Sequence, residues 1–223
     1  HCEELSLVRG GVMNEGVVSR SLGVPGIHPA AEDAATAREI ALAAASGCPV
    51  HICHVSTRGS VALLRDARRR GVPVTGETAP HYMLLTDALL RGRDADYRMN
   101  PPLRSDDDVA AILAGVADGT LTAVATDHAP HSPADKADFL KAPNGAIGME
   151  TSLSAAYTAL VLPGHISLSR LIWLMSASPA ALLGLPGGSL KPGAAADILL
   201  FDPAETWTVS PDKLHGKSRN TPF

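Results

Sequence analysis

The residues best suited to chemistry in this sequence are a carboxylate and several histidines at the ends of short apolar runs. Asp127 follows the run Ala123–Thr126, and His131 comes four residues later. His54 ends a second apolar run, and His1 stands at the first position of the chain. Carboxylates and neutral imidazoles bind divalent metals, and the same groups transfer protons. These residues predict a metal-binding or proton-transfer site; solvated loop residues are the alternative.

Three predicted strands would position these side chains. Apolar runs near residues 48–54, 72–79 and 121–127 each end in polar or ionisable residues, and helical patterns lie between them. Such alternation predicts a parallel sheet whose strand ends meet at one edge, where β/α barrels build their active sites. We prefer half of a β/α barrel to a doubly wound sheet, because no Gly-rich phosphate loop follows a strand.

The remaining elements follow from periodicity and capping residues. We expect helices over residues 32–46, 59–70, 105–117, 150–162, 168–177 and 179–183. The loop 132–148 is long enough to suggest a functional role. Residues 196–201 and 207–209 have the pattern of strands and suggest a small, incomplete β domain. We therefore divide the chain into a barrel part, residues 1–186, and a β part, residues 187–223.

Several polar residues have both a functional and a structural interpretation. His51 and His54 are three residues apart, which places them on opposite faces of a regular strand. We expect His54 at the site and His51 packed as a structural residue. His81 could act at the site or bind a loop carbonyl. Asn100 offers donors and an acceptor to an amide-like ring, whereas Arg104 suits a carboxylate but would more often be solvated.

Composition excludes several classes of protein. A net charge of −4 and a pI near 6.1 give no basic footprint for nucleic acid. No apolar run approaches the ~18 residues of a membrane span. Three cysteines without CxxC spacing indicate a reducing, cytoplasmic setting. Because the chain begins at His1 rather than at Met, we interpret it as part of a longer protein.

Five stretches, in order along the whole chain, resemble the class I dihydroorotases of the amidohydrolase superfamily. The stretches are His1–Glu3, His51–Thr57, Met99–Arg104, Ala125–His131 and Asn220–Phe223. The resemblance implies an α/β fold, namely the C-terminal half of a (β/α)8 TIM-like barrel. It also implies that residues 187–223 are part of a small β-sandwich domain made from both chain ends.

The resemblance further implies a zinc-dependent, reversible cyclisation of N-carbamoyl-L-aspartate to dihydroorotate, with one or two Zn2+ ions per complete subunit. His1 and His54 would hold one zinc; Asp127 would hold the other and act as general acid and base. Zinc lowers the pKa of a bound water to about 7, which supplies a nucleophile for amide hydrolysis. Contacts with dihydroorotate would come from Asn100, His131 and the backbone at Asn144 and Gly145.

The family's His-x-His motif and its bridging Asp belong to a half that is missing here, so this chain would carry half of the metal site. We expect residues 1–223 alone to be poorly soluble, to bind zinc weakly and to be inactive. Allantoinase and dihydropyrimidinase remain alternative activities. A non-catalytic partner of aspartate transcarbamoylase is another alternative, although such homologues tend to lose the metal ligands present here. A homodimer and an association with aspartate transcarbamoylase are also compatible with the resemblance.

Overall fold

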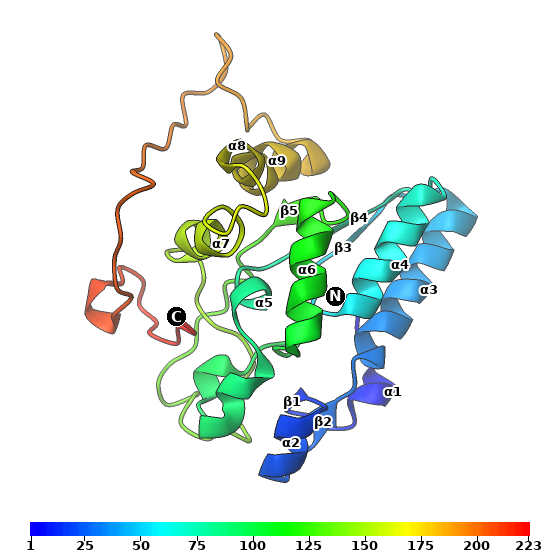
Figure 1. Ribbon diagram of the computed structural model, residues 1–223, viewed down its shortest axis with the longest axis vertical. Coiled ribbons are helices and arrows are strands. Elements are labelled where there is room, and N and C mark those ends of the chain that lie inside the picture. Colours follow the sequence, from blue (N-terminus) through cyan, green and yellow to red (C-terminus); the bar gives the residue numbers. More distant parts are fainter.

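Parallel strands and helices alternate through the middle of the chain. β3 (Val50–Ile52), β4 (Val74–Thr78) and β5 (Ala123–Val124) form a three-stranded sheet in that order, and both neighbouring pairs are parallel. α4 (Arg58–Arg69) joins the first two strands, and α6 (Asp106–Ala117) lies between the last two in sequence. This computed structural model describes all residues 1–223 (Figure 1). The predicted parallel sheet is confirmed.

The long helices begin and end where the sequence supplies caps. α3 (Ala30–Ser46) ends at Gly47, whose φ of +72° is a left-handed conformation that glycine adopts without strain. The Thr57 side chain accepts a hydrogen bond from a backbone N–H in the first turn of α4. Ser105 and Asp108 form a capping box at the start of α6. The helices predicted over residues 32–46, 59–70 and 105–117 are thus confirmed to within two residues.

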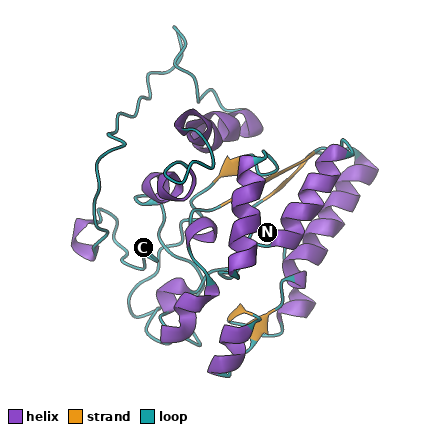
Figure 2. Cartoon of the chain, in the orientation of Figure 1, coloured by secondary structure: helices purple, strands orange, loops and turns teal.

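One face of the sheet is covered by α3, α4 and α6, which lie side by side (Figures 1 and 2). The core between them consists of aliphatic side chains that are almost fully buried, including Ile40, Ile52, Leu64, Val74, Ile112 and Leu121. Each such side chain stabilises the fold by about 1.5–3 kcal/mol relative to an exposed one. The main hydrophobic core therefore holds the strands against these helices.

The other face of the sheet borders a cavity of about 720 Å3. Side chains of β3 and β4 line it together with Leu182 and Leu183, the last two residues of α9 (Ser178–Leu183). Helices therefore cover the two faces of this sheet unequally.

Shorter elements complete the structure. Near the start of the chain, β1 (Met13–Asn14) and β2 (Gly26–Ile27) form a separate parallel pair. The remaining helical segments are α1 (Leu5–Val8), α2 (Val17–Leu22), α5 (His81–Leu84), α7 (Ser152–Leu160), α8 (Leu168–Ile172), the π-helical η3 (Trp173–Ala177), and the 3-10 turns η1 (Asp87–Gly92), η2 (Ala95–Tyr97) and η4 (Pro211–Lys213). None of the helices combines the length and apolar character needed to cross a membrane.

The loop 132–148 is packed against the rest of the chain. Its Phe139, Ala142 and Ala146 belong to a second buried cluster. Lys136 Nζ donates hydrogen bonds of 2.9 Å to the carbonyls of Ala95 and Pro143. Burial lowers the pKa of Lys136 to about 8. These contacts fix the loop beside the second buried cluster.

Residues 187–223 contain no strand in this structure, so the strands predicted at 196–201 and 207–209 are not observed (Figure 2). A strand requires a hydrogen-bonded neighbour, and residues 190–208, which are all exposed, extend away from the helices before the chain returns to them (Figure 1). The side chain of Leu200 is 89% exposed as a result. The assignment of residues 187–223 to a β-sandwich stays a prediction.

Candidate active site

Two imidazoles that are far apart in sequence meet after the end of β3. His1 Nδ1 lies 2.8 Å from His54 Nε2, and the two ring centroids are 4.6 Å apart. His54 has φ +39°, in the left-handed region, two residues after the last residue of the strand. Its Nδ1 is buried without a hydrogen-bond partner. The structure thus brings together the two histidines predicted to share one metal ion.

Asn100 and Glu3 surround the other side of the His1 ring. Asn100 Nδ2 is 3.2 Å from His1 Nε2, and Glu3 Oε2 is 3.4 Å from both of these nitrogens. Asn100 Oδ1 is buried and has no partner. The sequence interpretation gave Glu3 no role, although its position two residues after a predicted ligand was a usable signal: alternate residues of an extended segment share a face.

Asp127 lies in the loop that follows β5. Its φ of +49° is also left-handed. Burial raises the pKa of Asp127; His54 lowers this pKa, and the Glu77 carboxylate raises it. Asp127 therefore lies close enough to His54 to interact with it electrostatically.

The donor set at this place fits zinc in chemical type. Zinc takes imidazole nitrogens and carboxylate oxygens, and two imidazole nitrogens converge here with one unpartnered nitrogen behind them. His1, His54 and Asp127 do not form a closed group of three. The only trio of such ligand atoms within 4.8 Å of one another belongs to His51, Cys53 and Glu77. The chain therefore supplies residues of the right type for a catalytic metal, but these residues alone do not surround a metal position.

The trio revises the interpretation of His51 as a packed structural residue. His51 is only half-buried; its Nε2 is 3.2 Å from Glu77 Oε2 and its Nδ1 is 2.7 Å from Thr75 Oγ1. Strand register causes this arrangement, because His51 is directly opposite Thr75 in the β3–β4 pair. The register was not available from the sequence alone.

His131 and the predicted substrate-binding residues of the loop 132–148, Asn144 and Gly145, form a second group. His131 Nε2 donates to the Asn144 carbonyl at 2.9 Å, because a carbonyl can only accept. Gly145 N donates to the Arg98 carbonyl at 2.7 Å. Gly145 has φ +114°, and a Cβ there would lie 2.4 Å from Ala129 Cβ. The geometry requires glycine, and the Gly145 N–H is already used within the chain.

Asn220 ties this second group together from the far end of the chain. Its Oδ1 accepts from His131 N at 3.1 Å, and its Nδ2 donates to the carbonyls of Ala129 and Gly145 at 3.0 and 3.2 Å. The Asn220 carbonyl accepts from Ile147 N at 2.9 Å. Asn220 was noted only as part of a motif, and its structural role was not predicted.

Arg104 is buried, so the solvated interpretation is wrong, and the carboxylate that it contacts is Glu32 of the chain itself. Its guanidinium lies 3.6 Å from Glu32 Oε2 and donates to Ser56 Oγ and Asn14 Oδ1, each at 3.1 Å. Glu32 in turn accepts from the backbone N–H of Ser56 at 2.9 Å and from that of Thr57 at 3.1 Å. This network holds the segment that follows His54.

His81 is buried, and its Nε2 has no hydrogen-bond partner. Desolvation, with a smaller contribution from the neighbouring His54, lowers the pKa of His81 to about 3. His81 is therefore a neutral imidazole, and it follows the C-terminal end of β4.

Comparison with known proteins places this geometry in a family. The amidohydrolase family model matches residues 19–221. Dihydroorotases from Citrifermentans bemidjiense and from Geobacter metallireducens are each 54% identical to this chain over 224 aligned residues, which cover 100% of the chain and 53% of each relative. The chain belongs to the amidohydrolase family, whose members are generally metal-dependent and have a TIM-barrel-type fold. It spans about half the length of the curated relatives it matches.

Solved structures agree on the fold. A dihydropyrimidinase from Brevibacillus agri NCHU1002 superposes with a TM-score of 0.81 at 30% identity, covering 95% of this chain and 49% of that protein. A D-hydantoinase from a Thermus species gives a TM-score of 0.84 at 26% identity, covering 96% and 50%. Sequence identity is thus higher to dihydroorotases than to these two structural neighbours.

Proposed function

We propose that the protein carrying this chain is a zinc-dependent dihydroorotase, which interconverts N-carbamoyl-L-aspartate and dihydroorotate in pyrimidine biosynthesis. The observation that carries the proposal is the 54% identity to dihydroorotases over the entire chain. The neighbours named dihydropyrimidinase and D-hydantoinase are only 30% and 26% identical. The convergence of His1 and His54 supports a metal-dependent enzyme over a homologue that has lost its ligands.

We also propose that the chain is the C-terminal half of a TIM-like barrel, residues 1–186, followed by part of a β-sandwich, residues 187–223. Three parallel strands with helices packed on one face, and a fourth strand expected to end at His1, support half of the eight units of a complete barrel. The match to about half the length of each relative also supports it.

In this proposal, His1 and His54 hold one zinc ion, and Asp127 holds a second. Bound zinc supplies Lewis acidity that polarises the amide carbonyl of the substrate ring. Asp127 accepts a proton from the water whose oxygen bonds to the ring carbonyl carbon. It then delivers that proton to the ring nitrogen as the C–N bond breaks, and cyclisation reverses these steps.

Substrate binding in this proposal involves Asn100, His131 and the backbone at Asn144 and Gly145. The unpartnered Oδ1 of Asn100 is an acceptor for a ring N–H, because a buried polar atom without a partner costs free energy until a ligand satisfies it. His131 holds Asn144 through its Nε2 and so links its own position to that of the loop.

The test is the substrate preference of the whole protein as its gene encodes it, purified with zinc. We expect ring opening of dihydroorotate at alkaline pH and its formation from carbamoyl-aspartate at mildly acidic pH. Faster turnover of dihydrouracil or allantoin would instead indicate one of the related cyclic amidohydrolases. A zinc-loaded protein without activity on any of these compounds would support a non-catalytic partner of aspartate transcarbamoylase.

Location and assembly form part of the same proposal. All three cysteines are free, which supports a reducing, cytoplasmic setting. A homodimer and a complex with aspartate transcarbamoylase are compatible with the proposed activity and can be tested by the mass of the purified protein in solution.

A further inference from the structure

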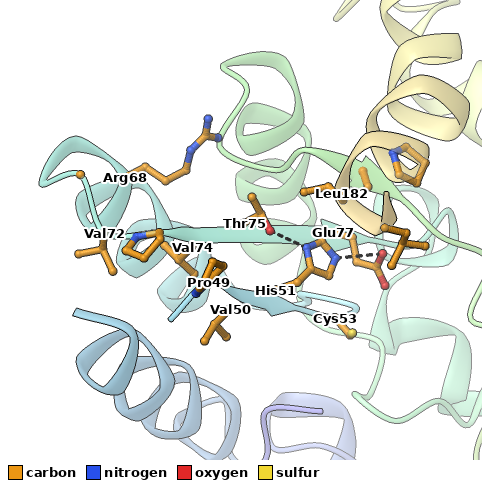
Figure 3. Close-up of a pocket in the computed structure, with 15 residues that line it drawn as sticks. Pro49, Val50, His51, Cys53, Arg68, Val72, Val74, Thr75, Glu77 and Leu182 are labelled. Atoms are coloured by element: carbon orange, nitrogen blue, oxygen red, sulfur yellow. Dashed lines mark hydrogen bonds and ion pairs between the residues drawn. The ribbon is translucent and has the colours of Figure 1, made fainter. Parts of the chain in front are cut away.

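His51, Cys53 and Glu77 form a cluster on the sheet that the proposed mechanism does not use. His51 and Cys53 are two residues apart on and just after β3, so they share a face of the strand. Glu77 lies on the neighbouring β4. All three side chains line the cavity on the sheet face away from the core residue Ile52 (Figure 3).

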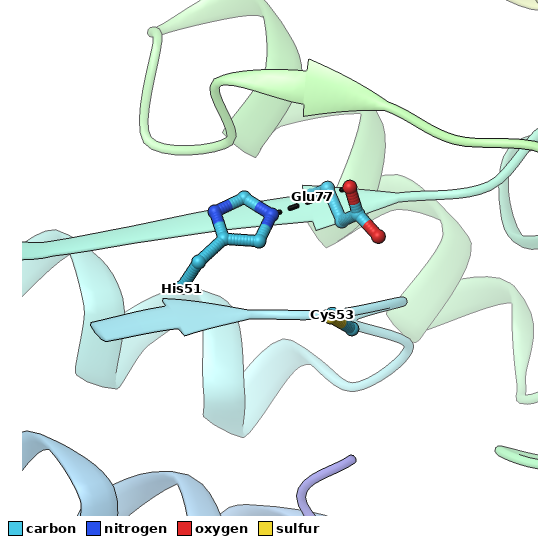
Figure 4. A group of neighbouring side chains, drawn as sticks. All are labelled: His51, Cys53 and Glu77. Carbon is cyan, nitrogen blue, oxygen red and sulfur yellow. Dashed lines mark ion pairs between the residues drawn. The ribbon is translucent and has the colours of Figure 1, made fainter. Parts of the chain in front are cut away.

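The three ligand atoms lie near enough to one another to contact a single divalent cation. One imidazole nitrogen, the Cys53 sulfur and a Glu77 oxygen lie within 4.8 Å of one another (Figure 4). The His51 ring is already oriented, because its Nδ1 pairs with Thr75 Oγ1 at 2.7 Å while its Nε2 faces Glu77 at 3.2 Å. Metal-binding histidines are commonly fixed in this way through the ring nitrogen that does not contact the metal.

We propose that His51, Cys53 and Glu77 bind a zinc-like divalent cation at a site next to His1, His54 and Asp127 that uses none of those three residues as ligands. Imidazole, thiolate and carboxylate are the three side-chain ligands that zinc and cadmium use in proteins. Binding converts the Cys53 thiol to a thiolate and releases its proton to solvent. The side chains of His51 and Glu77 are 30% and 20% exposed in this chain, on the sheet face that becomes the interior of the proposed barrel.

The alternative is that the cluster is only an ion pair between His51 and Glu77. In that case Cys53 would bind no metal. The test therefore follows the sulfur. The whole protein is stripped of metal under reducing conditions and titrated with Cd2+, and the ultraviolet sulfur-to-cadmium charge-transfer band is recorded. We expect a band that saturates at an amplitude of one thiolate ligand per chain, because cadmium bound at His1, His54 and Asp127 has no sulfur ligand there. Absence of the band in the unmodified protein would overturn the proposal.

Matched variants assign the band. Cys53→Ser should abolish it, whereas Cys48→Ser, which alters an exposed free cysteine, should leave it unchanged. His51→Gln and Glu77→Gln should each weaken cadmium binding by more than about tenfold. A band that survives Cys53→Ser, or an affinity that His51→Gln leaves unchanged, would show thiol binding without this site.

A further variant separates this site from the proposed catalytic one. Asp127→Asn should retain the band and its affinity, whatever it does to turnover. A loss of the band in Asp127→Asn would show that the cadmium belongs to the catalytic site. A protein that lacks dihydroorotase activity but binds cadmium through Cys53 would contradict only the proposed function.

Discussion

His1 Nδ1 faces His54 Nε2 at 2.8 Å, across 53 positions of sequence. One of these two ring nitrogens donates to the other, and a metal ion bound to both would replace this hydrogen bond. The His54→Asn variant should therefore lose metal affinity by about 10–100-fold, measured as bound metal after dialysis against increasing chelator. The control is His28→Asn, which alters an exposed histidine that accepts from Ala30 N. Equal metal retention in the two variants would refute the ligand assignment.

Asp127→Asn should reduce kcat for dihydroorotate by about 10²–10⁴-fold, because the amide cannot carry a proton between water and the ring nitrogen. Asp66→Asn is the matched control: Asp66 forms an exposed ion pair with Arg70 on α4 and should leave kcat unchanged. Steady-state hydrolysis of the whole protein is the measurement. A retained kcat in Asp127→Asn would assign proton transfer to another residue.

Gly145→Ala should raise KM for dihydroorotate more than it lowers kcat. The added Cβ would lie 2.4 Å from Ala129 Cβ at a residue with φ +114°, so the loop must shift away from its present position. Holding a non-glycine residue in such a conformation costs about 1–3 kcal/mol. Gly92→Ala, where a Cβ would meet no atom within 4 Å, is the control and should leave KM unchanged.

Arg104→Met should destabilise the protein by about 3–5 kcal/mol, because it leaves the buried Glu32 carboxylate without its cation. Arg58→Met breaks an exposed pair with Asp107 and should cost less than about 1 kcal/mol. The free energy of unfolding in urea would be compared for the two variants. Similar losses in both would show that the buried network contributes no more than a surface pair.

His81 makes stability depend on pH. Desolvation lowers the pKa of His81 to about 3 in the folded state, so between that value and the unfolded pKa near 6.5 only the unfolded chain takes up the proton. Stability contributed by His81 is therefore complete above about pH 6.5 and is lost as pH falls, by about 1.4 kcal/mol per pH unit.

The His81→Gln variant removes this dependence. Its free energy of unfolding should fall less steeply than that of the unmodified protein between pH 7 and pH 5, as measured by urea unfolding at several pH values. Parallel curves for the two proteins would show that His81 is accessible to protons in the folded state.

Periodic and capping signals predicted the three-stranded sheet and the long helices around it. Gly47 and Ser105 mark helix boundaries through local chemistry, and local chemistry can be interpreted without knowing the fold. The same reasoning failed at residues 196–201, where strand formation requires a partner that this structure does not place beside them. Whether a segment forms a helix or a strand was thus predictable where residues close in sequence determine it.

The candidate site was predictable in part. His1, His54 and Asn100 were expected together because each belongs to a family motif, and they meet. The pairing of His51 with Glu77 and the burial of Arg104 could not be predicted, since both depend on strand register and on packing between distant segments.

The left-handed backbone at His54 and Asp127 has a consequence for interpreting substitutions. Of the residues with a Cβ, asparagine, aspartate and histidine are the ones most often found with positive φ, and two of these types are also metal ligands. The shape of the chain at these two positions and its proposed chemistry therefore select from the same few amino acids. An alanine or valine there would change the path of the backbone together with the ligand, whereas asparagine changes the ligand alone. Preference for a residue type at these positions is thus not, by itself, a record of catalysis.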